Sequence, residues 1–147
     1  MFIDTSALAK RYLMEAGAPW LRSMLHPALG HVVIMSHLTT VELFSLLARR
    51  SREGSLPVSH ATLLGDAFLT HAADDYLVVP AGAQVLERAR ALIRRYPLRT
   101  LDAIQLASAR HTANVLGETI TFISSDRDLL AAAGADGLLT ANPLDHQ

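Results

Sequence analysis

Hydrophobic and polar positions fall into blocks along the chain, and the blocks predict strands and helices in alternation. Short apolar runs predict buried strands at residues 2–3, 31–35, 76–79, 119–123 and 137–140. Between these runs, apolar residues at helical spacing predict helices over 7–16, 18–29, 37–53, 58–73, 84–96 and 101–116, and a short helix to about 133 opened by 124–126. Ser36 and Thr100 are the expected N-caps of the helices that follow them.

This alternation predicts an α/β fold, a three-layer α/β/α sandwich with a mostly parallel central sheet of four to five strands. No repeat or linker interrupts the pattern, so we expect a single domain over residues 1–147. In sheets of this kind the functional crevice lies beyond the carboxyl ends of the strands. Asp4 follows the first predicted strand and Asp126 follows the fourth, which brings both acids to that edge.

Composition narrows the class of protein. Half of the residues are hydrophobic and 18% are charged, a balance that excludes intrinsic disorder. The chain has no Cys, which excludes disulfides, zinc knuckles, iron–sulfur clusters and thiol nucleophiles. Because 13 basic residues face 14 acidic ones, any contact with nucleic acid must be local. The acid at position 4 and the short apolar runs argue against an export signal or a membrane span, so we expect a cytoplasmic protein.

Two more acids lie inside predicted helices, where a plain fold favours apolar residues. Glu42 has mostly apolar or small helical neighbours, and Asp102 lies in the first turn of its helix. Taken singly, Asp4, Asp102 and Asp126 fit helix caps or the helix dipole, and Glu42 fits a border residue paired with an arginine. Together at one sheet edge the four would repel strongly, and Mg²⁺ or Mn²⁺ with oxygen ligands is the usual relief.

Four motifs in order carry a family resemblance. They are Phe-Ile-Asp-Thr-Ser-Ala at 2–7, Thr-Thr-Val-Glu-Leu at 39–43, Leu-Arg-Thr-Leu-Asp-Ala-Ile-Gln-Leu-Ala at 98–107 and Phe-Ile-Ser-Ser-Asp-Arg-Asp-Leu at 122–129. The pattern resembles the PIN-domain ribonucleases, most closely the toxin component of VapBC toxin–antitoxin pairs. The motifs span nearly the full chain, and its length is similar to that of a single PIN domain.

The resemblance assigns roles residue by residue. It implies that the metal-binding acids are Asp4, Glu42, Asp102 and Asp126, and Asp128 matches a further acid that some members carry. Side chains expected to orient these acids are Thr5, Ser6, Thr39, Ser124, Ser125 and Gln105. The chain departs from the family pattern at two of these positions: Gln105 stands where many relatives have His, and Ser124 where many have Thr. Both keep a hydrogen-bonding group.

The implied activity is that of a metal-dependent endoribonuclease. A cation held by Asp4, Asp102 and Asp126 would lower the pKa of a bound water and orient it at an RNA phosphodiester. Glu42 would bind metal or take the proton of the attacking water. The resemblance implies a 5′-phosphate and a 3′-hydroxyl as products, and leaves one-metal and two-metal mechanisms open. Arg99, three residues before Asp102, is the expected contact to an RNA phosphate.

The resemblance also implies partners, namely a cognate antitoxin that holds the toxin inactive and a second copy in a homodimer. The chain carries apolar residues beyond what a small sheet needs. Most should be core, with some left for an antitoxin groove or dimer interface, at Leu8, Tyr12, Trp20, Leu21, Leu43, Leu46 and Leu47. Two other interpretations stay open, a housekeeping PIN nuclease without an antitoxin and a PIN-fold binding module without catalysis.

Overall fold

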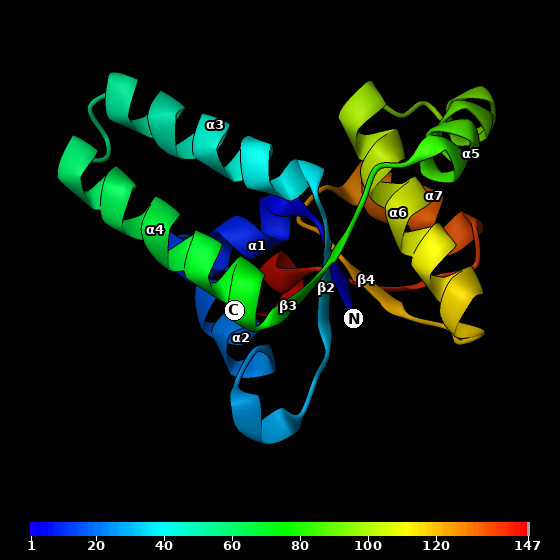
Figure 1. The fold of residues 1–147 in the computed structure, drawn as a ribbon, viewed down its shortest axis with the longest axis horizontal. Helices are drawn as coiled ribbons and strands as arrows, with labels where there is room; N and C mark the ends of the chain where they lie inside the picture. The colour runs from blue at the N-terminus through cyan, green and yellow to red at the C-terminus, as the bar shows by residue number, and fades with distance from the viewer. Residues whose placement is uncertain (147) are drawn as a thin grey trace.

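The computed structural model describes residues 1–146, in which strands and helices alternate as shown in Figure 1. Its elements are β1 (Phe2–Ile3), α1 (Thr5–Tyr12), α2 (Ala18–Met24), η1 (Pro27–Leu29), β2 (Val33–Ser36), α3 (Leu38–Arg52), α4 (Val58–Asp74), β3 (Tyr76–Val79), α5 (Ala83–Arg95), α6 (Thr100–Leu116), β4 (Thr121–Ile123), α7 (Arg127–Ala135), β5 (Leu139–Ala141) and η2 (Pro143–Asp145), where η marks a short 3₁₀ turn. Within those residues no helix combines the length and hydrophobicity needed to cross a membrane.

The five strands form one sheet in the order β3-β2-β1-β4-β5, and every pairing is parallel. This confirms the predicted fold class. The order reverses at β1, which pairs with β2 on one side and with β4 on the other. Ligand crevices of such sheets lie where the strand order reverses, beyond the carboxyl ends of the strands. Asp4 immediately follows β1, so the reversal sets the location of the candidate site.

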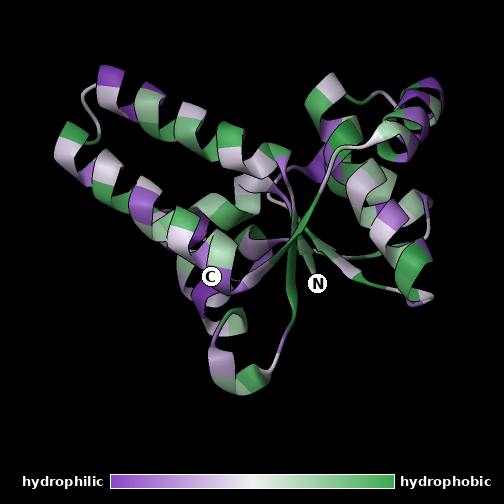
Figure 2. Cartoon of the chain, viewed as in Figure 1, coloured by the Kyte–Doolittle hydropathy of each residue, from purple (hydrophilic) through white to green (hydrophobic). Residues whose placement is uncertain are grey.

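Both faces of the sheet are covered by helices because the strands are apolar on both sides. Phe2, Ile34 and Phe122 face one way and pack with α5, α6 and α7. Ile3 and Ile123 face the other way and pack with α1 to α4. Figure 1 shows the two helical layers on opposite sides of the strands, with α3 and α4 projecting as a hairpin. In Figure 2 the central strands are mainly in the hydrophobic colour.

Three local expectations about helix bounds and caps are wrong. The first helix runs over Thr5–Tyr12 rather than 7–16, because the Asp4 side chain accepts from Ser6 N and Leu13 turns to extended backbone. The segment 18–29 is α2 followed by a separate 3₁₀ turn, since Pro27 forces the residue before it out of the helical region. Thr100 is the first residue of α6, and its N-cap is Arg99.

Ser36, the predicted N-cap of α3, fills that role only in part. The N-cap of α3 is His37, which makes no side-chain capping bond. Ser36 is the last residue of β2, yet its Oγ accepts a hydrogen bond from Leu38 N at 3.2 Å. Ser36 therefore satisfies one of the free N–H groups at the start of the helix, as a capping side chain does.

Candidate active site

The predicted acids meet at a pocket of about 530 Å³ beyond the carboxyl ends of β1 and β4. Its lining includes all four of them, each contributed by a different segment: Asp4 after β1, Glu42 from α3, Asp102 from α6 and Asp126 before α7. Residues far apart in sequence reach one pocket because the parallel strands deliver their carboxyl ends to the same sheet edge.

Asp4 is held in a fixed orientation by two hydroxyls. It is only 5% exposed. Its Oδ2 accepts from Ser6 Oγ at 2.6 Å and from Ser124 Oγ at 3.0 Å, and also caps α1 through Ser6 N. The hydrogen bonds that residues 1–146 donate to the Asp4 carboxylate therefore converge on one oxygen, which leaves Oδ1 for another ligand.

Glu42, from α3, is oriented in the same manner by side chains of α1 and α6. Its Oε2 accepts from Thr5 Oγ1 at 2.7 Å and from Gln105 Nε2 at 2.6 Å. The Gln105 amide also donates to Thr39 Oγ1 at 3.0 Å, so α1, α3 and α6 are joined at this point. Glu42 is half-buried at the border of the apolar face of α3, as its helical neighbours predict.

Asp126 and Asp102 lie at the starts of their helices. Asp126 is the N-cap of α7, where its Oδ1 accepts from Asp128 N at 2.9 Å and from Leu129 N at 3.0 Å. Asp102 lies in the first turn of α6 and is half-buried. The cap function predicted for Asp126 is therefore real, and the same side chain also lines the pocket. A cap and a pocket ligand are compatible because only one carboxylate oxygen is used by the helix.

The charges of the pocket acids act on one another. Burial raises the pKa of Asp4, and the Glu42 charge adds to this while hydrogen bonds from Ser6 and Ser124 oppose it. Burial also raises the pKa of Asp102, with the charges of Asp126 and Asp4 acting in the same direction and Arg99 opposing. Closely spaced carboxylates disfavour one another's ionised form, which is the condition that a bound cation relieves.

The donor set fits a hard cation, but the acids are not drawn together into a preformed metal site. The polar groups at the acid end of the pocket are carboxylates and hydroxyls, the oxygen ligands that Mg²⁺ and Mn²⁺ prefer. Within residues 1–146, no three His, Cys, Asp or Glu side chains lie close enough together to hold one ion. Asp128 is exposed in the first turn of α7 and is not part of the pocket lining.

The side chains expected to orient the acids lie where that role requires, with one difference. Thr5, Ser6, Ser124 and Gln105 each bond directly to an acid, and Thr39 bonds to Gln105. The hydroxyl of Ser125 instead donates to the backbone oxygen of Ser6 at 3.4 Å, while its N–H donates to Ser6 Oγ at 2.9 Å. Ser125 therefore acts on the acids only through Ser6.

The same pocket has a basic part that lies outside the four sequence motifs. Besides Arg99, the lining includes Lys10, Arg49 and Arg50, together with the acid Glu15. Lys10 was detectable as the one lysine of the chain, placed on the otherwise apolar face of a short helix. Glu15 gave no signal, because it follows α1 in a segment whose conformation only the tertiary structure defines.

Comparison with known proteins identifies the family. A family model for the PIN domain matches residues 1–135. The chain belongs to the PIN domain family. The match covers all four motifs, and thus every acid that lines the pocket of this PIN domain. Among the curated proteins, none matches the chain significantly.

Solved structures with this fold include toxins and toxin–antitoxin complexes. VapC20 of Mycobacterium tuberculosis, a toxin that cleaves the Sarcin-Ricin loop, is 22% identical with a TM-score of 0.65, over 94% of this chain and 95% of that one. VapBC2 of Rickettsia felis, bound to a promoter DNA fragment, is 12% identical with a TM-score of 0.64, over 96% of both chains. FitAcB of Neisseria gonorrhoeae is 17% identical with a TM-score of 0.64, over 99% of both chains. At these identities the likeness supports the PIN fold.

Proposed function

We propose that this PIN domain is a metal-dependent endoribonuclease and the toxin of a type II toxin–antitoxin pair. The observation that carries the proposal is the meeting of four acids, from four separate segments, at the point where the strand order reverses. Family membership supports a nuclease, and the likeness to VapC and VapBC structures supports the toxin assignment.

In the proposed mechanism, Asp4, Glu42, Asp102 and Asp126 are the residues that would hold Mg²⁺ or Mn²⁺. The chemistry that such a cation supplies when bound is a lowered pKa of water and neutralisation of phosphate charge. Ser6 and Ser124 keep Asp4 turned towards the pocket through their bonds to its Oδ2. Gln105 and Thr5 keep Glu42 in place to bind metal or to accept a proton from the attacking water. Arg99, which lies in the pocket wall, would contact a phosphate of the RNA.

The same proposal includes a cognate antitoxin, a homodimer and a cytoplasmic location. The apolar residues that the sequence suggested for a groove are mostly core: Leu8, Tyr12, Leu21, Leu43 and Leu47 are buried. Large apolar side chains remain exposed on several elements, and those on the α3–α4 hairpin are Val41, Phe44, Val58, Leu63 and Leu69. This hairpin, which projects in Figure 1, is the surface that supports a protein partner.

One experiment tests the activity directly. Purified protein is incubated with end-labelled RNA and Mg²⁺ or Mn²⁺, and the products are resolved on a gel. We expect cleavage by the wild type and none by Asp4→Asn or Asp126→Asn, although both variants should still bind RNA in a filter assay. Asn retains the capping acceptor at both positions, so the helices should persist. Cleavage by the two variants at wild-type rate would show that the acids are structural caps.

A second experiment separates the toxin from its alternatives. Expressed alone in its host, the wild type should inhibit growth, and Asp4→Ala should not. Co-expression with the protein of the adjacent reading frame should restore growth and yield a complex. Cleavage without growth inhibition would favour a housekeeping PIN nuclease. Soluble, folded wild type that neither cuts RNA nor inhibits growth would favour a binding module.

A further inference from the structure

Lys10 is a buried cation in the wall of the acid pocket. It lies in α1, its side chain is 7% exposed, and it lines the pocket together with the four acids. An ammonium group carries three donors, and removing it from water is costly unless those donors are paired. The ammonium of Lys10 therefore requires partners that accept its hydrogen bonds.

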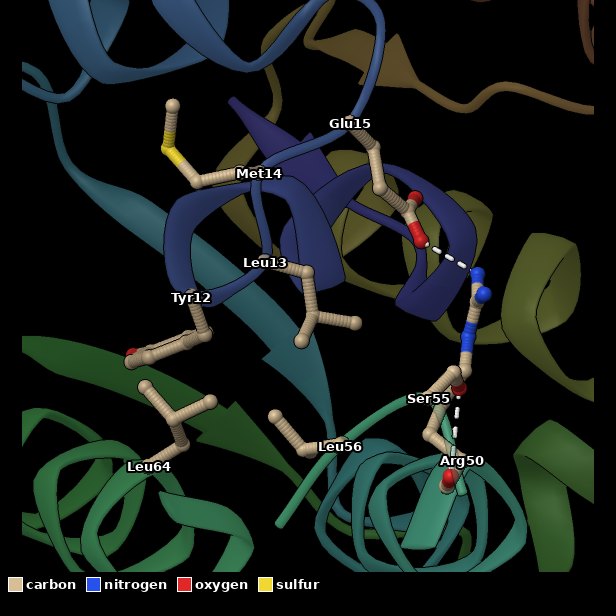
Figure 3. A pocket seen from close by; sticks show the side chains of 8 residues that line it. All are labelled: Tyr12, Leu13, Met14, Glu15, Arg50, Ser55, Leu56 and Leu64. Carbon is tan, nitrogen blue, oxygen red and sulfur yellow. Dashed lines mark hydrogen bonds and ion pairs between the residues drawn. The ribbon is translucent and has the colours of Figure 1, made fainter. Parts of the chain in front are cut away.

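Glu15 is the carboxylate partner of Lys10 within residues 1–146, and the contact is long. The Lys10 Nζ and Glu15 Oε2 are 3.5 Å apart, well beyond the roughly 2.7–2.9 Å of a charge-assisted hydrogen bond. The other oxygen of Glu15 is bound more tightly, since Arg50 Nη2 lies 2.6 Å from Oε1. Figure 3 shows this Glu15–Arg50 pair, with Ser55 bonded to the backbone oxygen of Arg50.

Glu15 thus serves two cations at once. The group formed by Lys10, Glu15 and Arg50 carries a net charge of +1, and the charge on Glu15 is engaged mainly by Arg50. Lys10 consequently faces the pocket with donors that Glu15 does not satisfy. A methionine of similar length would fill the same wall without the desolvation penalty, and Glu15 would keep Arg50 as its partner.

An anionic ligand would complete the coordination of Lys10. The pocket lining combines the four acids, which repel phosphate, with the basic residues Lys10, Arg49 and Arg50. A phosphodiester strand matches this lining when a cation neutralises the acids, because its phosphates then meet positive charge. Lysine binds such a phosphate as a point charge, without demanding the planar geometry that arginine prefers.

We propose that Lys10, held in place by Glu15 and Arg50, binds a phosphate of the RNA strand beside the cluster of four acids. This proposal rests on the proposed function for its substrate class, RNA. It assigns Lys10 to substrate binding, Glu15 and Arg50 to positioning its ammonium, and no proton transfer to any of the three.

The test uses the cleavage-deficient Asp126→Asn protein and a fluorescently labelled single-stranded oligoribonucleotide, titrated with Mg²⁺ at several salt concentrations. Adding Lys10→Met should make the negative slope of log affinity against log salt shallower by about 0.7, and should lower the affinity near 0.1 M salt by about fivefold. Lys10→Arg should keep most of the wild-type slope and affinity. Arg52→Met is the matched control, since Arg52 loses the same charge from an exposed position outside the pocket lining and should change the slope little.

The competing explanation is that Lys10 serves the fold alone, and the thermal midpoint distinguishes the two. Equal slopes for Lys10→Met and Arg52→Met, or a lowered thermal midpoint with an unchanged slope, would overturn the proposal. If Lys10→Met fails to fold, Lys10→Gln takes its place with the same expected slope. A wild type that binds RNA through Lys10 without cutting it contradicts only the nuclease function. A wild type that cuts RNA while Lys10→Met keeps its slope contradicts only the role of Lys10.

Discussion

The Nε2 of Gln105 lies 2.6 Å from the Oε2 of Glu42, and this hydrogen bond joins α6 to α3 beside the acid pocket. Gln105 is 1% exposed, and its Oε1 has no hydrogen-bond partner within residues 1–146. The buried amide is therefore used only as a donor, towards a carboxylate and two threonine hydroxyls. This arrangement orients Glu42 at the cost of leaving one polar atom unpaired.

Replacing this amide should reduce activity more than stability. Gln105→Met keeps the volume but removes the donor to Glu42, so the carboxylate is no longer held by α6. We expect RNA cleavage to fall at least about tenfold, as loss of one hydrogen bond to a charged group implies. The free energy of unfolding should change by only about 1 kcal/mol, because the unpaired Oε1 is removed as well. Initial cleavage rates and urea denaturation measure the two effects.

Thr112→Val serves as the control for Gln105→Met. Thr112 is a buried polar residue of the same helix, bonded to Ser108 O at 2.8 Å and outside the pocket lining. It should leave the cleavage rate unchanged. Equal loss of activity in both variants would mean that any change in the α6 core disturbs catalysis, and that Gln105 has no specific role.

Divalent metal should stabilise the native protein. Ligands that bind only the folded state raise its stability by mass action, so millimolar Mg²⁺ or Mn²⁺ should raise the thermal midpoint. Asp102→Asn should reduce this shift sharply, because it removes one of the four carboxylates. Differential scanning fluorimetry with and without EDTA provides the measurement. No shift in the wild type at millimolar metal would remove the basis for a metallonuclease.

Asp4→Asn should stabilise the metal-free protein while it abolishes cleavage. Burial raises the pKa of Asp4, so the ionised side chain destabilises the native state at neutral pH. Asn keeps the N-cap of α1 without the charge, so the free energy of unfolding near pH 7 should be higher than that of the wild type. The gain should shrink as the pH falls towards 4, since native Asp4 then takes up a proton. Denaturation across this pH range, with exposed Asp66→Asn as the control, provides the check.

His71 of α4, which contacts Tyr12 of α1, should make the free energy of unfolding depend on pH. Its Nδ1 lies 2.9 Å from the hydroxyl of Tyr12, beside Arg11. Burial lowers the pKa of His71, Arg11 lowers it further, and Asp74 and Asp75 oppose the shift. The unfolded state therefore binds the proton first, and stability should decrease as the pH falls below about 6.5. Because Gln does not titrate, the urea midpoint of His71→Gln should change less with pH over that range than the urea midpoint of the wild type. Parallel plots of urea midpoint against pH for the two proteins would contradict this.

Local pattern by itself determined the sheet and most helices. Strand 76–79 and the helix ending at Leu116 are as predicted, because the strand is a continuous apolar run and Gly117 ends α6 in the left-handed conformation. The four acids were also recognisable, since charges among apolar residues are unfavourable in a plain fold. The sequence thus determined which side chains to examine and that two of them follow strands.

Only the tertiary structure decided which groups meet. Lys10, Glu15 and Arg50 come from a helix, the segment after it and the end of another helix, and no periodicity relates them. The same holds for Gln105 and Glu42, which lie 63 residues apart. Local spacing fixes contacts within one helix or strand, whereas contacts between layers depend on how the parallel strands place their helices. Pairing between distant residues is therefore a property of the packed sheet and helices, and that packing decided the structure of this pocket.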